Sequence, residues 1–303
     1  MNAWLHQNLR WLATTLLAIG VALGATFVNG QGPGPDSATT LHARYEALRD
    51  RLDHSPFQRP LHLDSRQKPG ALAGDVYAVV DHSFASVDAA VTGPQAWCDI
   101  LIVHLNVKYC RASSNDATAK LTTYVGTKRV QSLESAHRVD FTYRVVAASA
   151  DYINVQLAAA AGPLGTRDYR IVLQAVPVNA GHTFIHLSYS YGYGHVASLA
   201  MQSYLATIAS DKVGFTVVDR RTGGAPLLVG DVRGAVERNT MRYFLAIDAH
   251  LGAATVPPRD RVEKRLRDWF AATERYPLQL RELPQNEYLA MKLSELRRQE
   301  VER

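Results

Sequence analysis

The chain has 303 residues, of which 47% are hydrophobic and 20% charged, and its formal net charge at pH 7 is +5. This charge is mild and no basic run is interleaved with aromatic residues, which argues against a nucleic-acid-binding protein. The chain has no HExxH or CxxC sequence and no His–carboxylate pair at metal-ligand spacing, so we expect neither a metal nor a cofactor.

The first 30 residues predict a signal peptide or an N-terminal membrane anchor. Residues 1–10 carry one basic side chain and no acidic one, residues 11–28 form an apolar run, and small residues precede Gln31. Cleavage before Gln31 is what a secretory signal peptide would undergo. The alternative is a retained anchor, because the run is about long enough to span a membrane. In both cases we expect the rest of the chain to be periplasmic or secreted.

Residues 31–73 predict a linker and a short helix. Gly, Pro and Ser are concentrated in residues 32–40, and His42–Asp53 has apolar residues at helical spacing. Prolines at positions 56, 60 and 69 break the segment that follows.

A strand and two short helices are predicted next. Residues 75–84 alternate weakly between apolar and polar and predict the strand. Ser86 is a good N-cap for a helix that begins at Val87, and Gln95–Leu101 predicts the second helix.

The two cysteines lie in the second of these helices and in the strand predicted after it, at Leu105–Arg111. In an oxidising compartment two cysteines tend to pair, so we expect a Cys98–Cys110 disulfide. The alternative is a pair of buried thiols.

Further alternating runs predict an antiparallel sheet with one apolar and one polar face. They follow a strand predicted at Lys120–Val130 and begin near Val139, Ile153, Tyr169 and Thr183. In the last run the odd positions are apolar or aromatic, and they are Thr183, Ile185, Leu187, Tyr189, Tyr191 and Tyr193.

The pattern after Gly194 is helical. We predict helices at Val196–Ile208 and Asp231–Leu251, and the second is longer and has Gly252 where a C-cap would lie. Two more amphipathic helices are predicted at Arg259–Glu274 and Asn286–Arg298. The local excess of basic residues in these last helices admits contact with an anionic membrane surface, although such residues are more often a solvated face.

This order of elements resembles the START-like, or helix-grip, superfamily of SRPBCC-type proteins. The resemblance rests on residues 75–98, which match the first strand and helix pair, and on residues 230–239, which match the start of the long gripping helix. It implies an α+β fold in which a curved antiparallel sheet grips a long C-terminal helix. The domain would span residues 74–252, and residues 253–303 would be a helical extension. The family's last strand runs almost directly into its gripping helix, whereas here Val196–Leu228 intervenes. Either the helix at Val196–Ile208 is an insertion that covers the cavity, which we favour because the later helix is longer and better patterned, or it is the gripping helix and Asp231–Leu251 is an addition.

The superfamily includes lipid-transfer domains, birch-pollen-allergen-like proteins and polyketide cyclases. The resemblance therefore implies an exported protein that holds a hydrophobic or lipid-like small molecule between sheet and helix. The side chains expected to line this cavity are Tyr143, Leu187, Tyr189, Tyr191, Tyr193 and Arg242. The alternative for the tyrosines is that they fill the core. Arg238 and Arg242 share one helix face, and one of them could pair with Asp140 or with an anionic ligand head, or both could be solvated.

Two other functions stay open. A cyclase- or hydrolase-type enzyme on the same fold would be favoured by a polar pair such as Tyr143 with His186 or with Arg242. An envelope scaffold would be favoured by a solid core. We expect no catalytic residue, because there is no GxSxG sequence. We also expect no histidine to be catalytic or to bind a metal, and place them at the surface or in hydrogen bonds. The histidines considered are His104, His182, His186 and His195.

Overall fold

The computed structural model describes residues 37–115, 118–194, 212–219 and 224–301. Contacts divide the chain into the units Met1–Gly32 and Pro33–Arg303, and all described residues belong to the second unit. The predicted signal or anchor and the helix predicted at Val196–Ile208 lie outside the described residues. No helix among the described residues is long and apolar enough to cross a membrane.

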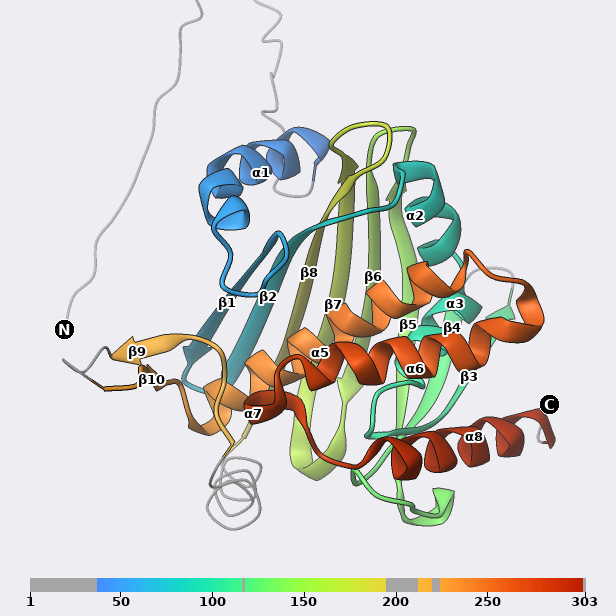
Figure 1. Ribbon diagram of the computed structural model, residues 1–303. Coiled ribbons are helices and arrows are strands. Elements are labelled where there is room, and N and C mark those ends of the chain that lie inside the picture. The colour runs from blue at the N-terminus through green and yellow to red at the C-terminus, as the bar shows by residue number, and fades with distance from the viewer. Residues whose placement is uncertain (1–36, 116–117, 195–211, 220–223, 302–303) are drawn as a thin grey trace, which may run out of the picture. The chain divides into compact units, whose positions relative to one another are not determined.

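The second unit is built on one sheet of eight strands in the order β1-β2-β8-β7-β6-β5-β4-β3 (Figure 1). Every neighbouring pair is antiparallel. In chain order the strands are β1 Leu61–Lys68, β2 Ala71–Val80, β3 Val107–Asn115, β4 Thr118–Val125, β5 His137–Ala148, β6 Ile153–Ala161, β7 Thr166–Pro177 and β8 Thr183–Tyr193.

Strand β1 was not predicted from the sequence. It lies between Pro60 and Pro69, and these prolines bound the strand instead of preventing it. β1 is an edge strand, where an adjacent proline removes no ladder hydrogen bond.

The long helix α5, Asp231–Ala253, lies across one face of the sheet, which we call the inner face. It packs on β1, β2 and β8. A side chain at Gly74 of β2 would collide with Thr240 Oγ1 of α5, so glycine permits the close approach of strand and helix. The sheet and α5 thus form the predicted helix-grip arrangement, with Asp231–Ala253 as the gripping helix.

Two short helices follow β2 and cover the far end of the inner face. They are α2, Phe84–Val91, and α3, Pro94–Leu101, and α3 packs on β3 and β4. The predicted start of the first helix is wrong by three residues. Ser83 is its N-cap and accepts a hydrogen bond from the backbone N–H of Ser86.

The predicted disulfide is present. Cys98 in α3 and Cys110 in β3 are bonded, with their Cα atoms 5.2 Å apart. The bond joins α3 to β3, which is the edge strand at the opposite side of the sheet from β1.

The face of the sheet that lies opposite α5, which we call the outer face, was expected to be polar. That prediction is wrong for one end of the face. Helix α1, Ala38–Asp53, packs on this end through three buried leucines. They meet outward-facing apolar side chains of β2, β7 and β8, which alternation analysis had assigned to a solvated face. The cluster comprises Leu41, Leu48, Leu52, Tyr77, Tyr152, Val176 and Phe184.

The C-terminal helices belong to the same compact unit as the sheet. They are α6 Arg261–Glu274, α7 Pro277–Leu280 and α8 Gln285–Val301. α6 packs on α5 and α8 packs on β3. A small separate sheet pairs β9, Val217–Asp219, with β10, Leu227–Leu228.

Candidate functional site

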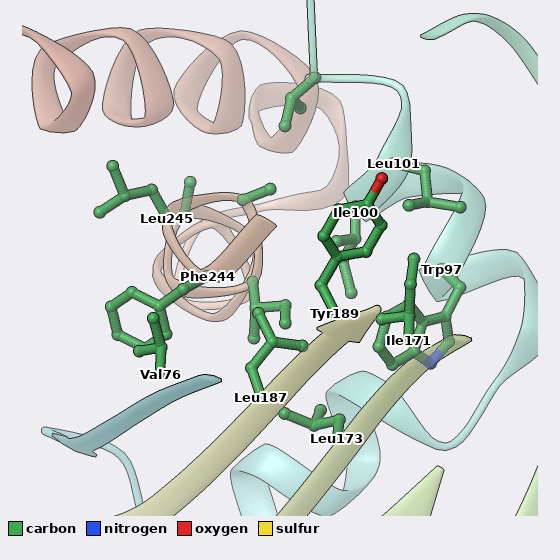
Figure 2. Packing of buried hydrophobic residues seen from close by; sticks show 14 of the residues in the cluster. Val76, Trp97, Ile100, Leu101, Ile171, Leu173, Leu187, Tyr189, Phe244 and Leu245 are labelled. Atoms are coloured by element: carbon green, nitrogen blue, oxygen red, sulfur yellow. The ribbon is translucent and has the colours of Figure 1, made fainter. Parts of the chain in front are cut away.

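The inner face of β8 carries three of the predicted ligand-binding residues. Leu187, Tyr189 and Tyr191 are 0%, 5% and 7% exposed. In Figure 2, Leu187 and Tyr189 point from β8 toward the helices, with Phe244 and Leu245 of α5 on the other side of the core. The alternation of β8 therefore assigned these side chains to the correct face.

Tyr189 begins a row of side chains that crosses the middle of the sheet. The pairing aligns Tyr189 of β8 with Ile171 of β7, Ile171 with Leu157 of β6, and Leu157 with Tyr143 of β5. Three strand spacings of ~4.8 Å place the two tyrosines roughly 14 Å apart at their backbones. We call this row, together with Tyr191, the tyrosine wall.

Tyr143, at the far end of the row, is 7% exposed and its hydroxyl has no hydrogen-bond partner among the described residues. Burial raises the pKa of Tyr143 to about 12. The hydroxyl is therefore a neutral donor and acceptor at neutral pH. Leaving such a group unpaired costs roughly 1–3 kcal/mol, which a ligand oxygen could recover.

His104 lies near the Tyr189 end of the row, where no pattern in the sequence predicted it. Its ring stacks on Tyr243 of α5, with ring centres 4.9 Å apart, and Tyr243 in turn lies 5.1 Å from Tyr189. Nδ1 of His104 accepts the backbone N–H of Asn106 at 3.2 Å, so the neutral ring carries its proton on Nε2.

The Nε2 atom of His104 is buried and has no hydrogen-bond partner in the described part of the chain. Burial lowers the pKa of His104 well below its usual value, and the nearby cations Arg242 and Lys292 lower it further. The ring is therefore neutral at physiological pH, and it presents an N–H donor without an acceptor.

The wall continues toward the end of β8 through Tyr169, another residue that sequence analysis did not select. Its ring stacks on Tyr191 at 5.3 Å, and its hydroxyl donates to Thr166 Oγ1 at 2.8 Å. Tyr193 is only partly buried, and its backbone N–H bonds the carbonyl of Gly70. Tyr193 therefore lies at the rim of the wall.

Arg242 is buried, but its described contacts are with the C-terminal segment. Its guanidinium donates to Glu282 at 2.7 Å and to the carbonyl of Leu280 at 3.2 Å. Lys128 bonds the same carboxylate, and burial together with Arg242 lowers the pKa of Lys128 to about 8.

The suggested partner of Arg242, Asp140, lies on the outer face of the sheet. Asp140 bonds Arg138 and Thr122 there, because even positions of β5 point away from α5. A pairing of Arg238 or Arg242 with Asp140 is therefore wrong.

His186 also lies on the outer face, so it cannot pair with Tyr143 across the sheet. Its Nε2 lies 2.9 Å from Asp75 Oδ1 and its Nδ1 lies 2.9 Å from Gln174 Oε1. The side chain of His186 is 17% exposed. The expectation that His182 and His186 face solvent together holds for His182 alone, whose side chain is 46% exposed. The enzymatic alternative thereby loses the Tyr143–His186 pair that would have favoured it.

Metal ligation has no support in the described residues, where no three His, Cys, Asp or Glu side chains are grouped to hold an ion. A surface pocket of about 630 Å³ lies on the outer face of β4 to β7, with Lys120, Thr142 and Arg170 in its polar lining. Tyr169 of the tyrosine wall also lines this pocket, and the cavity between the wall and α5 stays a prediction.

No family model and no curated protein matches the chain. Solved structures that resemble it include human StAR-related lipid transfer protein 5, with 12% identity over 56% of this chain and 91% of that one and a TM-score of 0.31. A norcoclaurine synthase from Thalictrum flavum has 13% identity over 48% and 92%, with a TM-score of 0.34. An aromatase/cyclase from Streptomyces has 14% identity over 64% and 94%, with a TM-score of 0.33. At these identities and TM-scores the likenesses carry no argument. The strand order, with α5 across the inner face, gives the helix-grip arrangement directly.

Proposed function

We propose that the protein is an exported binding protein that holds a hydrophobic or amphipathic small molecule between the tyrosine wall and helix α5. The wall supplies aromatic and aliphatic surface from β5 to β8, and α5 supplies Tyr243 and Phe244 opposite it. Sites for such molecules are mostly apolar, with a few polar groups that fix the ligand's orientation.

The observation that carries the proposal is the pair of unpaired polar groups at the wall. The Tyr143 hydroxyl and the His104 Nε2–H are both buried without a partner among the described residues. Buried polar groups are bonded in the great majority of cases, so each exception needs a reason. A ligand that carries an oxygen acceptor, such as a carbonyl, a hydroxyl or a carboxylate, would provide one.

Export is the part of the proposal that rests on the sequence of residues 1–30 and on the disulfide. A Cys98–Cys110 bond is expected in a periplasmic or secreted protein and is rare in a reducing cytosol.

The direct experiment is to purify the full chain from its native host, extract it with organic solvent and identify the bound small molecules by mass spectrometry. The proposal predicts a recurrent apolar or amphipathic compound with at least one oxygen acceptor, at a stoichiometry near one. The Leu187→Arg variant would place a charge on the inner face of β8 beside the wall, and Val172→Arg would place one on the outer face of β7 as a control. Loss of the compound from the first variant alone supports the site, whereas equal retention in both contradicts it.

A further inference from the structure

His104 belongs to a turn that several hydrogen bonds hold in place, so its ring has a defined position. The turn lies between α3 and β3, and the N–H of Val107 donates to the carbonyl of His104 at 3.1 Å. Helix α8 holds the same turn, because Lys292 donates to the carbonyls of His104 and Val107 at 2.7 and 2.8 Å. The Tyr288 hydroxyl donates to the carbonyl of Val103 at 2.9 Å. These bonds fix the backbone of His104 and leave its ring to the aromatic side chains beside the tyrosine wall.

The ring of His104 offers one hydrogen-bond donor that no described residue accepts. Tyr243 and Trp269 lie against the ring, with centroid distances of 4.9 and 6.4 Å. Nδ1 is occupied by the N–H of Asn106, and the buried Nε2 has no partner among the described residues. Because His104 is 3% exposed, bulk solvent does not serve this donor, and a bound ligand can supply the acceptor.

The contact of α8 with β3 next to His104 contains more cations than carboxylates. Lys108 and Lys292 are both 0% exposed and share a single carboxylate, that of Glu295, at 3.1 and 2.7 Å. Arg298 lies beside them and donates to the carbonyl of Lys108 at 3.0 Å instead of to a carboxylate. In these described contacts, three cations therefore have one acid between them.

Charge of this sign favours an anion beside the His104 ring. Burial lowers the pKa of His104 most, and Arg242, Lys292, Lys128 and Lys108 lower it further. The positive potential that opposes a second proton on the ring also stabilises a negative charge next to it. Such interactions are stronger in a buried site than in bulk water, because the effective dielectric constant is lower.

Tyr143, the other unpaired group at the wall, lies in a different environment. Burial raises the pKa of Tyr143 to about 12, with no contribution from a charged residue of the described chain. Its hydroxyl therefore suits an uncharged part of a ligand. The wall thus has a positively charged surrounding near His104 and a neutral one at Tyr143, which gives a bound molecule an orientation.

We propose that the ligand is a long-chain carboxylic acid whose carboxylate accepts the N–H of His104 Nε2 and whose apolar chain runs along the tyrosine wall toward Tyr143. This inference rests on the proposed function and adds the ligand's chemical class and direction. A single N–H donor suits a carboxylate, whereas a phosphate brings up to two charges and three acceptor oxygens that would need several donors. The neighbouring cations offset the cost of burying the carboxylate.

The test compares three head groups on one chain. Dodecanoic acid, dodecanol and dodecylamine are each titrated, at neutral pH, into the delipidated full chain loaded with the uncharged fluorescent probe Nile red. The wild type should release the probe with an affinity for the acid that is about tenfold higher than for the alcohol, because a hydrogen bond to a charged group is stronger than one to a neutral group. The amine should bind most weakly.

Two variants remove the donor and each keeps a different structural contact of His104. His104→Asn keeps an acceptor for the N–H of Asn106, and His104→Phe keeps a ring against Tyr243. Both should lose most of the preference for the acid over the alcohol. His250→Asn is the matched control and should keep that preference. Burial lowers the pKa of His250 to about 4, and its Nε2 already bonds the carbonyl of Ala90 at 3.1 Å.

The outcomes separate this inference from the proposed function. Equal affinity of the wild type for the acid and the alcohol overturns the inference and leaves the proposed function intact. An acid preference that persists in both His104 variants overturns the role of His104. If none of the three compounds displaces the probe, or the probe does not bind, both the inference and the proposed function are wrong.

Discussion

The tyrosine wall and the seam between α8 and β3 bury polar groups in opposite ways. In the seam, Lys292 donates to the carbonyls of His104 and Val107 and to Glu295, at 2.7 to 2.8 Å. Lys108 donates to the carbonyl of Leu105 and to the same Glu295. At the wall, the Tyr143 hydroxyl and His104 Nε2 have no described partner.

This difference separates a structural region from a candidate binding region. The seam pairs the buried ammonium groups of Lys108 and Lys292 with the protein's own carboxylate and carbonyl groups. Its hydrogen bonds hold α8 against β3, so we expect the seam to contribute to the stability of the fold. The wall leaves donors unpaired, and donors that a ligand can satisfy are the usual mark of a site prepared for one.

The largest effect is expected from Glu295→Gln. The change leaves the ammonium groups of Lys108 and Lys292 buried without a carboxylate, and breaking a buried ion pair costs about 3–5 kcal/mol. Glu287→Gln on the same helix is the matched control, because its ion pair with Arg129 is exposed and exposed pairs contribute at most about 1 kcal/mol. Urea denaturation of both variants measures the loss in the free energy of unfolding. Equal losses would mean that the ion pairs of the seam stabilise the fold no more than an exposed pair does.

The disulfide is expected to contribute about 3 kcal/mol, since it closes a short loop of sequence separation 12. Its removal in Cys98→Ala/Cys110→Ala should lower the free energy of unfolding without lowering affinity for a ligand at the wall, because neither cysteine lies on β5 or β8. A parallel loss of ligand affinity in the folded variant would show that the two regions are coupled.

Raising the pH above 8 should reveal how the buried Lys292 of the seam affects the stability of the fold. Burial lowers the pKa of Lys292 to about 8, while the unfolded chain keeps an ordinary lysine pKa near ~10.4. Between these values the unfolded state binds more protons, so stability should rise with pH from about 8, by up to ~1.4 kcal/mol per pH unit for this group. The rise should become smaller in Lys292→Met and keep the part that Lys128 contributes, because burial lowers the pKa of Lys128 to about 8 as well. A wild type whose stability falls over the same range would contradict the assignment.

Above about pH 10 the buried tyrosines act in the opposite direction. Burial raises the pKa of Tyr189 and Tyr191, so ionisation in the unfolded state then destabilises the fold. The lysine effect is therefore measured below pH 10.

Tyr143→Phe is expected to change the free energy of unfolding least, and the sign of that change is what tests the account. Tyr143→Phe removes an unpaired buried hydroxyl and should raise the free energy of unfolding by about 1 kcal/mol in the ligand-free protein. Tyr169→Phe removes a hydroxyl that bonds Thr166, and should lower it by a similar amount. If Tyr143→Phe is destabilising instead, its hydroxyl has a partner in the folded protein and the wall has one fewer group to offer a ligand.

Local patterns in the sequence were sufficient for most of the fold. A period of two placed Leu187, Tyr189 and Tyr191 on the inner face, and helical spacing over residues 231–251 identified the gripping helix. The disulfide was predictable because only two cysteines exist. Strand β1 was missed because its bounding prolines look like breaks until the strand is known to lie at the sheet's edge.

The features missed at the site depend on contacts between distant segments. Lys292 and His104 are ordinary polar residues in their own sequence neighbourhoods, and they meet only because α8 packs beside β3. His186 was expected in solvent because its strand alternates, whereas α1 and its neighbours cover much of the outer face at that end. Arg242 was expected at the ligand, but α7 and Glu282 approach it from the other side of α5. Periodicity within one segment cannot predict such contacts between segments that lie far apart in the sequence.

The central claim is that the tyrosine wall borders a space for a ligand, and titration of an apolar fluorescent probe into delipidated protein tests it most directly. The wild type should bind one probe, and Tyr189→Trp should weaken binding at least tenfold by narrowing the space. Ser190→Trp adds the same ring on the outer face of the same strand and should leave the affinity unchanged. A wild type that binds no probe, with Tyr189→Trp losing about 1–3 kcal/mol of stability from overpacking, would show a solid core and contradict the account.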